Sequence, residues 1–228
     1  RCMGHMLSVW TVTGNGKTEK RQILEELKKE PVTVFLILIN MLVFVITELT
    51  GGTEDTMHML RCGAAYTPAI IQGEYYRIFT SMFLHFGMQH LANNMLVLFV
   101  LGGRLERTTG KLKYLLIYLL GGAGGNLLCV FLELNHGDFA VSAGASGAVF
   151  AVMGAMIYAV IRGKGHIEDL SARQVVIMAA FSLYFGFTSE GVDNAAHVGG
   201  LLCGFILAVL LYHPSRKYSG HISERQGR

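Results

Sequence analysis

The chain has 228 residues, of which 52% are hydrophobic and only 15% are charged. Soluble domains usually carry about 25% charged residues, so this composition excludes an ordinary soluble domain and predicts an all-α membrane protein. The net charge of +3 is too small to indicate nucleic acid as a partner. The four cysteines are scattered without the spacing of a disulfide framework or a metal site, and no metal or cofactor is expected.

Six apolar runs have about the length that a helix needs to cross a bilayer. In chain order they are 32–49, 88–103, 112–133, 146–162, 172–188 and 194–212. We therefore expect one membrane domain over 32–212, between an N-terminal segment, 1–31, and a C-terminal tail, 213–228. Residues 18–30 fit either a solvated lead-in or a short helix on the membrane surface.

The lysines and arginines predict the orientation of these runs. All of them except Arg61 and Arg77 fall in the N-terminal segment, in the tail, or in or at the edges of the connections after the second and fourth runs. Basic residues accumulate on the cytoplasmic side of membrane proteins. Both termini are therefore expected in the cytoplasm, which requires an even number of spans, and six satisfies this.

The connection from Thr50 to Gly87 is long and not hydrophilic. Non-helical backbone at membrane depth is tolerated only where protein buries it. We expect this segment to pack against the bundle, partly within the outer leaflet, with Tyr75 and Tyr76 at the membrane interface.

Four polar residues stand out in or beside the apolar runs, where such residues are costly and indicate function. His90 and Asn94 share one helix face, Ser146 starts the fourth run, and His197 lies near the start of the sixth. The second, fourth and sixth runs all cross from outside to inside. The four side chains are therefore expected in one outward layer.

Small residues suggest how two of these runs approach each other. Gly144 and Ala148 flank Ser146 at small-xxx-small spacing, and the pattern G-x-x-x-G follows His197. Both patterns allow close packing of helix backbones. The fourth and sixth runs are therefore expected to pack together and to bring Ser146 near His197.

This grouping fits nucleophilic catalysis. A serine hydroxyl needs an adjacent base to become a good nucleophile, and histidine is the usual base. His90, the Asn94 amide and backbone N–H groups around Ser146 are candidate donors to an oxyanion. Taken singly, each residue also has a structural interpretation. Ser146 fits a role in helix packing, and His197 fits a bundle histidine whose hydrogen bonds are satisfied. His90 and Asn94 fit an interhelical hydrogen bond.

Three nearby polar residues receive only structural interpretations. His85 is expected at the lipid interface, Asn93 in packing, and Asp193 as a helix cap. None of them is expected to take part in catalysis.

The ordered set of motifs resembles the rhomboid family of intramembrane serine proteases. The matches are GASG at 144–147, H-x-x-x-N from His90 to Asn94, and A-H-x-x-G-x-x-x-G from Ala196 to Gly204. GGRLERTTG at 102–110, with Glu106 as its acid, and YYR at 75–77, with Arg77, are similar to two further family elements. The resemblance covers about 32–212.

The resemblance implies a six-transmembrane-helix, rhomboid-like bundle around a cavity that opens outward. It assigns Ser146 as the nucleophile, His197 as the general base and His90 with Asn94 as the oxyanion hole. Gly144, Gly147, Phe150, Gly200, Gly204, Arg77 and Glu106 are assigned supporting roles.

The implied reaction is peptide-bond hydrolysis in or near transmembrane segments of other membrane proteins, without a cofactor. The fifth run, with segment 139–145 or 189–193, is expected to gate lateral access of the substrate. The resemblance also implies an integral membrane location, and the short tails suggest a bacterial plasma membrane. The oligomeric state is not indicated.

Two positions depart from the family pattern. Tyr76 stands where the family typically has Trp, which is expected to change the seating of the loop. Phe150 stands where a Tyr often stacks under the base, so a ring remains available for stacking on His197 but its hydroxyl is lost.

Two other classes of function compete with an active protease. A catalytically inactive rhomboid relative would bind membrane proteins without cutting them, but the presence of both Ser146 and His197 favours activity. A small transporter or channel would often show internal repeats, and none is visible.

Overall fold

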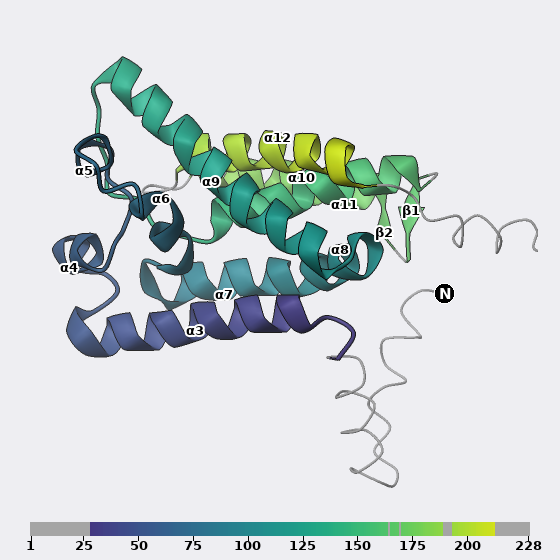
Figure 1. Ribbon diagram of the computed structural model, residues 1–228, viewed down its shortest axis with the longest axis horizontal. Helices are drawn as coiled ribbons and strands as arrows, with labels where there is room; N and C mark the ends of the chain where they lie inside the picture. The colour runs from purple at the N-terminus through teal and green to yellow at the C-terminus, as the bar shows by residue number, and fades with distance from the viewer. Residues whose placement is uncertain (1–27, 164, 169, 189–192, 213–228) are drawn as a thin grey trace, which may run out of the picture.

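A computed structural model describes residues 28–163, 165–168, 170–188 and 193–212 of the chain. The described part is mostly helical (Figure 1). Most of the interval 18–30, the C-terminal tail and most of the possible gating segment 189–193 lie outside the described residues.

The main helices follow the six apolar runs closely. They are α3 (Pro31–Gly51), α7 (Gly87–Val97), α9 (Lys111–His136), α10 (Ser146–Arg162), α11 (Ala172–Thr188) and α12 (Asn194–Leu211). The second run continues from α7 through one π-helical stretch, η3 (Leu98–Gly102), into α8 (Gly103–Thr109). Among the described residues, α3, α9 and α12 are long and apolar enough to cross a membrane, and α10 and α11 are shorter apolar helices.

The helices lie side by side, with the connecting elements gathered at the two ends (Figure 1). The elements at one end, here called the α5 end, are α4 (Thr56–Arg61), α5 (Thr67–Ile71), α6 (Arg77–Thr80) and the 3₁₀ turn η2 (Ser81–Phe83). The opposite end, the hairpin end, carries α8 and the antiparallel strands β1 (His166–Ile167) and β2 (Leu170–Ser171). The connection 50–87, which was expected to pack against the bundle, contains these short helices, and they satisfy much of its backbone.

Helix α10 lies at the centre of the bundle and packs closely on α12. A methyl group at Gly200 would clash with the carbonyl oxygen of Gly147, and one at Gly204 would clash with that of Ala151. The expected approach of the fourth and sixth runs is therefore present, and it depends on glycine because the backbones almost touch.

The prediction of which residues on the α10 side make that contact was wrong in part. Ala148 lies against α9, where a methyl group at Gly122 would come within 2.9 Å of its Cβ atom. Gly144 precedes the helix and lies against His90. Gly147 and Ala151 make the close contact with α12 instead, because they occupy the face of α10 that points to that helix.

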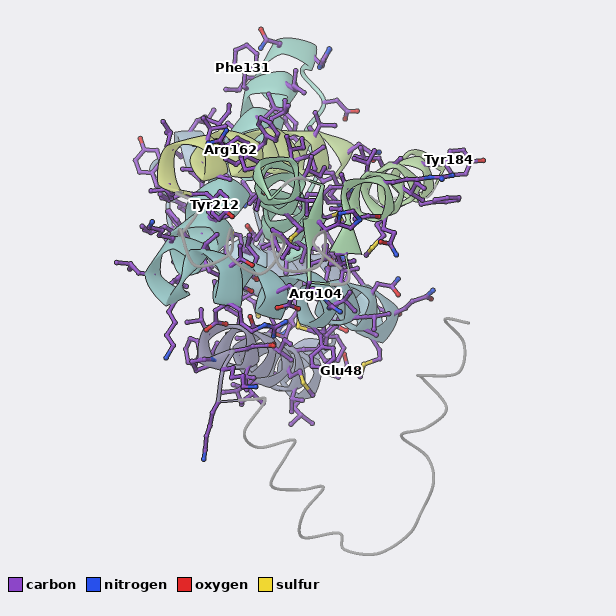
Figure 2. All side chains as sticks on the ribbon, turned by 90° about the vertical axis from the view of Figure 1, so that its right-hand side faces the viewer. Glu48, Arg104, Phe131, Arg162, Tyr184 and Tyr212 are labelled. Atoms are coloured by element: carbon purple, nitrogen blue, oxygen red, sulfur yellow. The ribbon has the colours of Figure 1, made fainter. Side chains whose placement is uncertain are left out.

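The outer surface of the bundle is apolar. Large hydrophobic side chains are exposed along α3, α9, α11 and α12. Figure 2 shows Phe131 of α9 and Tyr184 of α11 pointing away from the bundle. Such a surface suits a lipid solvent, in which an exposed apolar side chain carries no hydration cost.

Candidate active site

A cavity of about 730 Å³ is lined by residues of several helices and of the segment before α10. His90 and Asn94 of α7, Ser146 of α10 and His197 of α12 all contribute to its wall. The structure thus brings the four predicted site residues to one cavity. Volumes of this size fall within the range of ligand sites in proteins.

Ser146 is the first residue of α10. The segment before it is attached to the 65–81 region by backbone hydrogen bonds. Ser142 and Ala65 exchange two, at 2.9 and 2.8 Å, and the Gly144 N–H donates to the Ser81 carbonyl at 3.0 Å. The first N–H groups of a helix have no acceptor within the helix, so the backbone at Ser146 offers donors beside its hydroxyl.

His197 lies in the first turn of α12 and is buried. Its ring stacks on Phe150, with 4.4 Å between the ring centroids and an angle of 22° between the planes. The expected stacking is therefore confirmed. Asp193 caps this helix through a 2.8 Å hydrogen bond from the Ala196 N–H, as expected, so the helix start that carries His197 is fixed.

The structure records no hydrogen bond between the Ser146 hydroxyl and the His197 ring. The Nδ1 atom of His197 is buried and has no hydrogen-bond partner among the described residues. Catalytic hydrogen bonds are often long in the absence of substrate and shorten when it binds. Ser146 and His197 thus line one cavity, and no hydrogen bond between them is recorded.

The two candidate oxyanion donors, Asn94 and His90, each have a feature that suits this role. The Asn94 side chain is buried, and its Nδ2 donor has no partner among the described residues. His90 lies so close to Gly144 that a methyl group there would come within 2.8 Å of the ring Nε2 atom and 3.6 Å of the Ser146 hydroxyl oxygen. A larger residue at 144 would have to displace the His90 ring, and the His90 ring and the Ser146 hydroxyl both lie close to this one position.

The 60–81 segment is held by Arg77, as its supporting role suggests. Arg77 is buried, and its Nη1 atom donates to the carbonyls of Leu60 at 2.7 Å and Ala64 at 2.9 Å. Its Nε atom donates to Glu74 at 2.6 Å. Hydrogen bonds from the Tyr76 hydroxyl and from Arg77 hold the pKa of the Glu74 carboxyl below its usual range. The exposed Tyr76 ring takes part through this contact rather than through burial.

Glu106 supports the opposite end of the bundle. Its buried carboxylate accepts hydrogen bonds from the N–H groups of Val32 and Thr33, at 3.0 and 2.8 Å, and from the Thr33 hydroxyl at 2.8 Å. It therefore caps the start of α3 from a different helix. This contact is far from Ser146, so the role of Glu106 is structural.

Two expectations about neighbouring polar residues were wrong. His85 is completely buried rather than at the lipid interface, and its Nε2 atom accepts a hydrogen bond from the Ala145 N–H at 3.3 Å. Asn93 was expected to pack, yet it is exposed and lines the cavity. His85 thus contacts the backbone just before Ser146, and Asn93 faces the cavity.

Sequence reasoning missed Asn126 of α9. Its amide donates to the Ile78 carbonyl at 2.7 Å and to the Ser81 hydroxyl at 3.0 Å, and the residue lines the cavity. The available signal was an amide in the middle of a long apolar run, where a polar side chain indicates function. No cluster of potential metal ligands occurs in the part of the chain that the structure describes.

Comparison with known proteins agrees with the motifs. The chain is 34% identical to rhomboid protease GluP of Bacillus subtilis (strain 168), over 82% of this chain and 36% of that protein. It is 35% identical to RHOMBOID-like protein 5 of Arabidopsis thaliana, over 75% of this chain and 54% of the relative. It is 31% identical to rhomboid protease AarA of Providencia stuartii, over 78% of this chain and 71% of that protein.

The chain thus spans only about a third to a half of the first two of these relatives. The family model of the Rhomboid domain matches residues 72–214, which is more than half of the chain and includes every candidate catalytic residue. Together with the helical bundle and its apolar surface, this match identifies an integral membrane protein, and the chain belongs to the rhomboid family.

Proposed function

We propose that this chain is an intramembrane serine endopeptidase that cuts other membrane proteins in or near their transmembrane segments. Ser146 is the nucleophile and His197 the general base. The observation that carries the proposal is the meeting of Ser146, His197, His90 and Asn94 at one cavity, in a chain of the rhomboid family. Relatives at 34% and 31% identity bear the name rhomboid protease.

The first half of the reaction forms an acyl-enzyme. The Ser146 oxygen attacks the substrate carbonyl carbon while His197 takes the hydroxyl proton. The Asn94 amide, His90 and the Ser146 backbone N–H donate to the oxyanion that develops on the carbonyl oxygen. The tetrahedral intermediate then breaks its C–N bond, and His197 gives its proton to the leaving amine.

The second half uses water and needs no cofactor. His197 takes a proton from the water that attacks the Ser146 ester, and the same donors stabilise the second oxyanion. Breaking the ester bond returns the proton to Ser146 and releases the new carboxylic acid. The stacking of Phe150 on His197 keeps the imidazole facing the cavity through both halves.

The same proposal includes the arrangement in the membrane. The rhomboid-like domain comprises 32–212, between cytoplasmic segments 1–31 and 213–228, and crosses the membrane six times. The α5 end then faces outward, because Arg61 and Arg77 lie there while the hairpin end carries Arg104, Arg107 and Arg162. The cavity opens to the outside of a plasma membrane, as in a bacterial cell.

The proposal is tested by reconstituting the chain into liposomes with a panel of single-span substrates. The wild type is expected to cut some of them, and Ser146→Ala to cut none. Ser142→Ala is the matched control, since Ser142 also lines the cavity but is held through its backbone. Equal cleavage by wild type and Ser146→Ala would rule out the nucleophile. A wild type that binds the panel without cutting it would favour a binding module instead.

A further inference from the structure

His85 is a fully buried titratable residue that the proposed mechanism does not use. Its relative exposure is 0%, and it is not among the residues that line the cavity. It therefore does not reach a substrate in the cavity. Its Nε2 atom nevertheless accepts the N–H of Ala145, the residue directly before Ser146.

His85 and His90 contact each other and two adjacent residues, Ala145 and Gly144, of the same short turn. The two rings meet edge to face, with 5.2 Å between centroids and an angle of 73° between planes. His90 packs against Gly144, and His85 binds the backbone of Ala145. The position of Ser146 is thus linked to the position of His90 through one pair of rings.

The chemistry of this contact specifies the protonation state of His85. A ring nitrogen that accepts a hydrogen bond carries no proton, so the neutral ring has its proton on Nδ1. Ala145 is fully buried, and loss of the acceptor would leave its N–H unpaired away from water. The turn would then move to find another acceptor, and Ser146 would move with it.

We propose that His85 is a positioning residue of the active site: by accepting the Ala145 N–H, it fixes the turn that presents Ser146 beside His90. The proposal rests on the proposed function of Ser146. Because His85 touches no substrate, its loss should lower kcat and leave KM nearly unchanged.

Two amide substitutions make a matched pair. In His85→Gln the side-chain oxygen reaches about as far as the Nε2 atom and can replace it as the acceptor. In His85→Asn the oxygen reaches only about as far as Nδ1 and falls short of Ala145. The variants share their polarity and differ by one methylene group, so reach is the variable that the comparison isolates.

The experiment measures kcat and KM for a cleaved transmembrane substrate in liposomes. His85→Asn and His85→Leu should lower kcat about 10-fold or more, the size expected for one orphaned buried donor, with KM within about 2-fold of wild type. His85→Gln should stay within about 3-fold of wild-type kcat. The hydrogen exchange of the peptide containing Ala145 should be faster in His85→Asn than in His85→Gln.

The outcomes separate this proposal from a structural role and from the proposed function. Full kcat in His85→Asn, or equal loss in His85→Gln and His85→Asn, would overturn it, as would losses that simply follow the fall in melting temperature. If His85→Leu does not fold, the amide pair still decides. If the wild type cuts and only the His85 effect is missing, this proposal alone fails. If the wild type cuts nothing, both fail as statements about catalysis.

Discussion

At the scale of single residues, the contact between Phe150 and His197 bears most directly on the proposed general base. Among the described residues, the Nδ1 atom of His197 has no hydrogen-bond partner, and the stack on Phe150, with 4.4 Å between the ring centroids, restricts the ring. Stacked aromatic pairs contribute about 0.5–1.5 kcal/mol beyond their burial. Phe150 lacks the hydroxyl of the tyrosine that the family pattern often has at this position, but its ring still stacks on His197.

We expect Phe150→Ala to lower kcat about 3- to 10-fold, the factor that corresponds to the loss of one aromatic pair. Phe150→Tyr should keep the stack and remain near the wild-type rate. Phe131→Ala, on the exposed face of α9, is the control for removing a phenylalanine without touching the site. Steady-state cleavage in liposomes measures all three, and an unchanged rate in Phe150→Ala would show that the stack does not orient the base.

At the scale of helices, α3 is joined to the rest of the bundle by Glu106. Pro31 suits the first turn of α3 because it has no N–H to satisfy. The next two N–H groups, of Val32 and Thr33, are satisfied by the Glu106 carboxylate. A negative charge at a helix N-terminus also interacts favourably with the helix dipole.

Glu106→Ala should lower the free energy of unfolding by about 2–4 kcal/mol, because it orphans several buried donors at once. Thr33→Val removes only the hydroxyl contact and should cost about 1 kcal/mol. Unfolding in mild detergent micelles measures both. A Glu106→Ala protein as stable as the wild type, or less destabilised than Thr33→Val, would contradict the cap.

The boundaries of the main helices could be predicted from sequence because lipid imposes a minimum apolar length on each span. The π-helical stretch at 98–102 in the second run could not be predicted, because it does not alter the apolar composition of that run. The short helices between 50 and 87 were not predicted. Their backbone is held by tertiary contacts such as those of Arg77, which spacing along the chain does not reveal.

The candidate site was predictable in its main residues but not in its supports. Ser146 and His197 stand out as polar groups in apolar runs, whereas His85 lies among apolar residues that suggested the lipid interface. Its true position depends on Ala145, 60 residues away along the chain. The face of α10 that meets α12 was also misjudged, because two sets of small residues one turn apart fit the spacing equally well.

At the scale of the whole molecule, the two ends of the bundle carry different groups. The α5 end holds the start of α10 and α12, so the proposed catalytic groups lie there, and the hairpin end holds most of the described arginines. Arg107 joins α8 to the hairpin by donating to Glu168 at 2.8 and 2.7 Å. This distribution of charge is the basis for expecting the α5 end on the outside.

Cys62, which is exposed at the α5 end, tests that orientation. In a variant whose other cysteines are alanine, a membrane-impermeant maleimide should label Cys62 in right-side-out vesicles without lysis. Arg162→Cys, in the same background with Cys62→Ala, lies at the hairpin end and should be labelled only after lysis. The reverse pattern would show that the chain has the opposite orientation.

The central claim, that His197 activates Ser146, is tested most directly by reaction with a fluorophosphonate followed by mass spectrometry. The account predicts one adduct, located on Ser146, and labelling at least about 10-fold slower in His197→Ala because the hydroxyl has lost its base. An adduct on another residue, or labelling of Ser146 at the wild-type rate in His197→Ala, would contradict it.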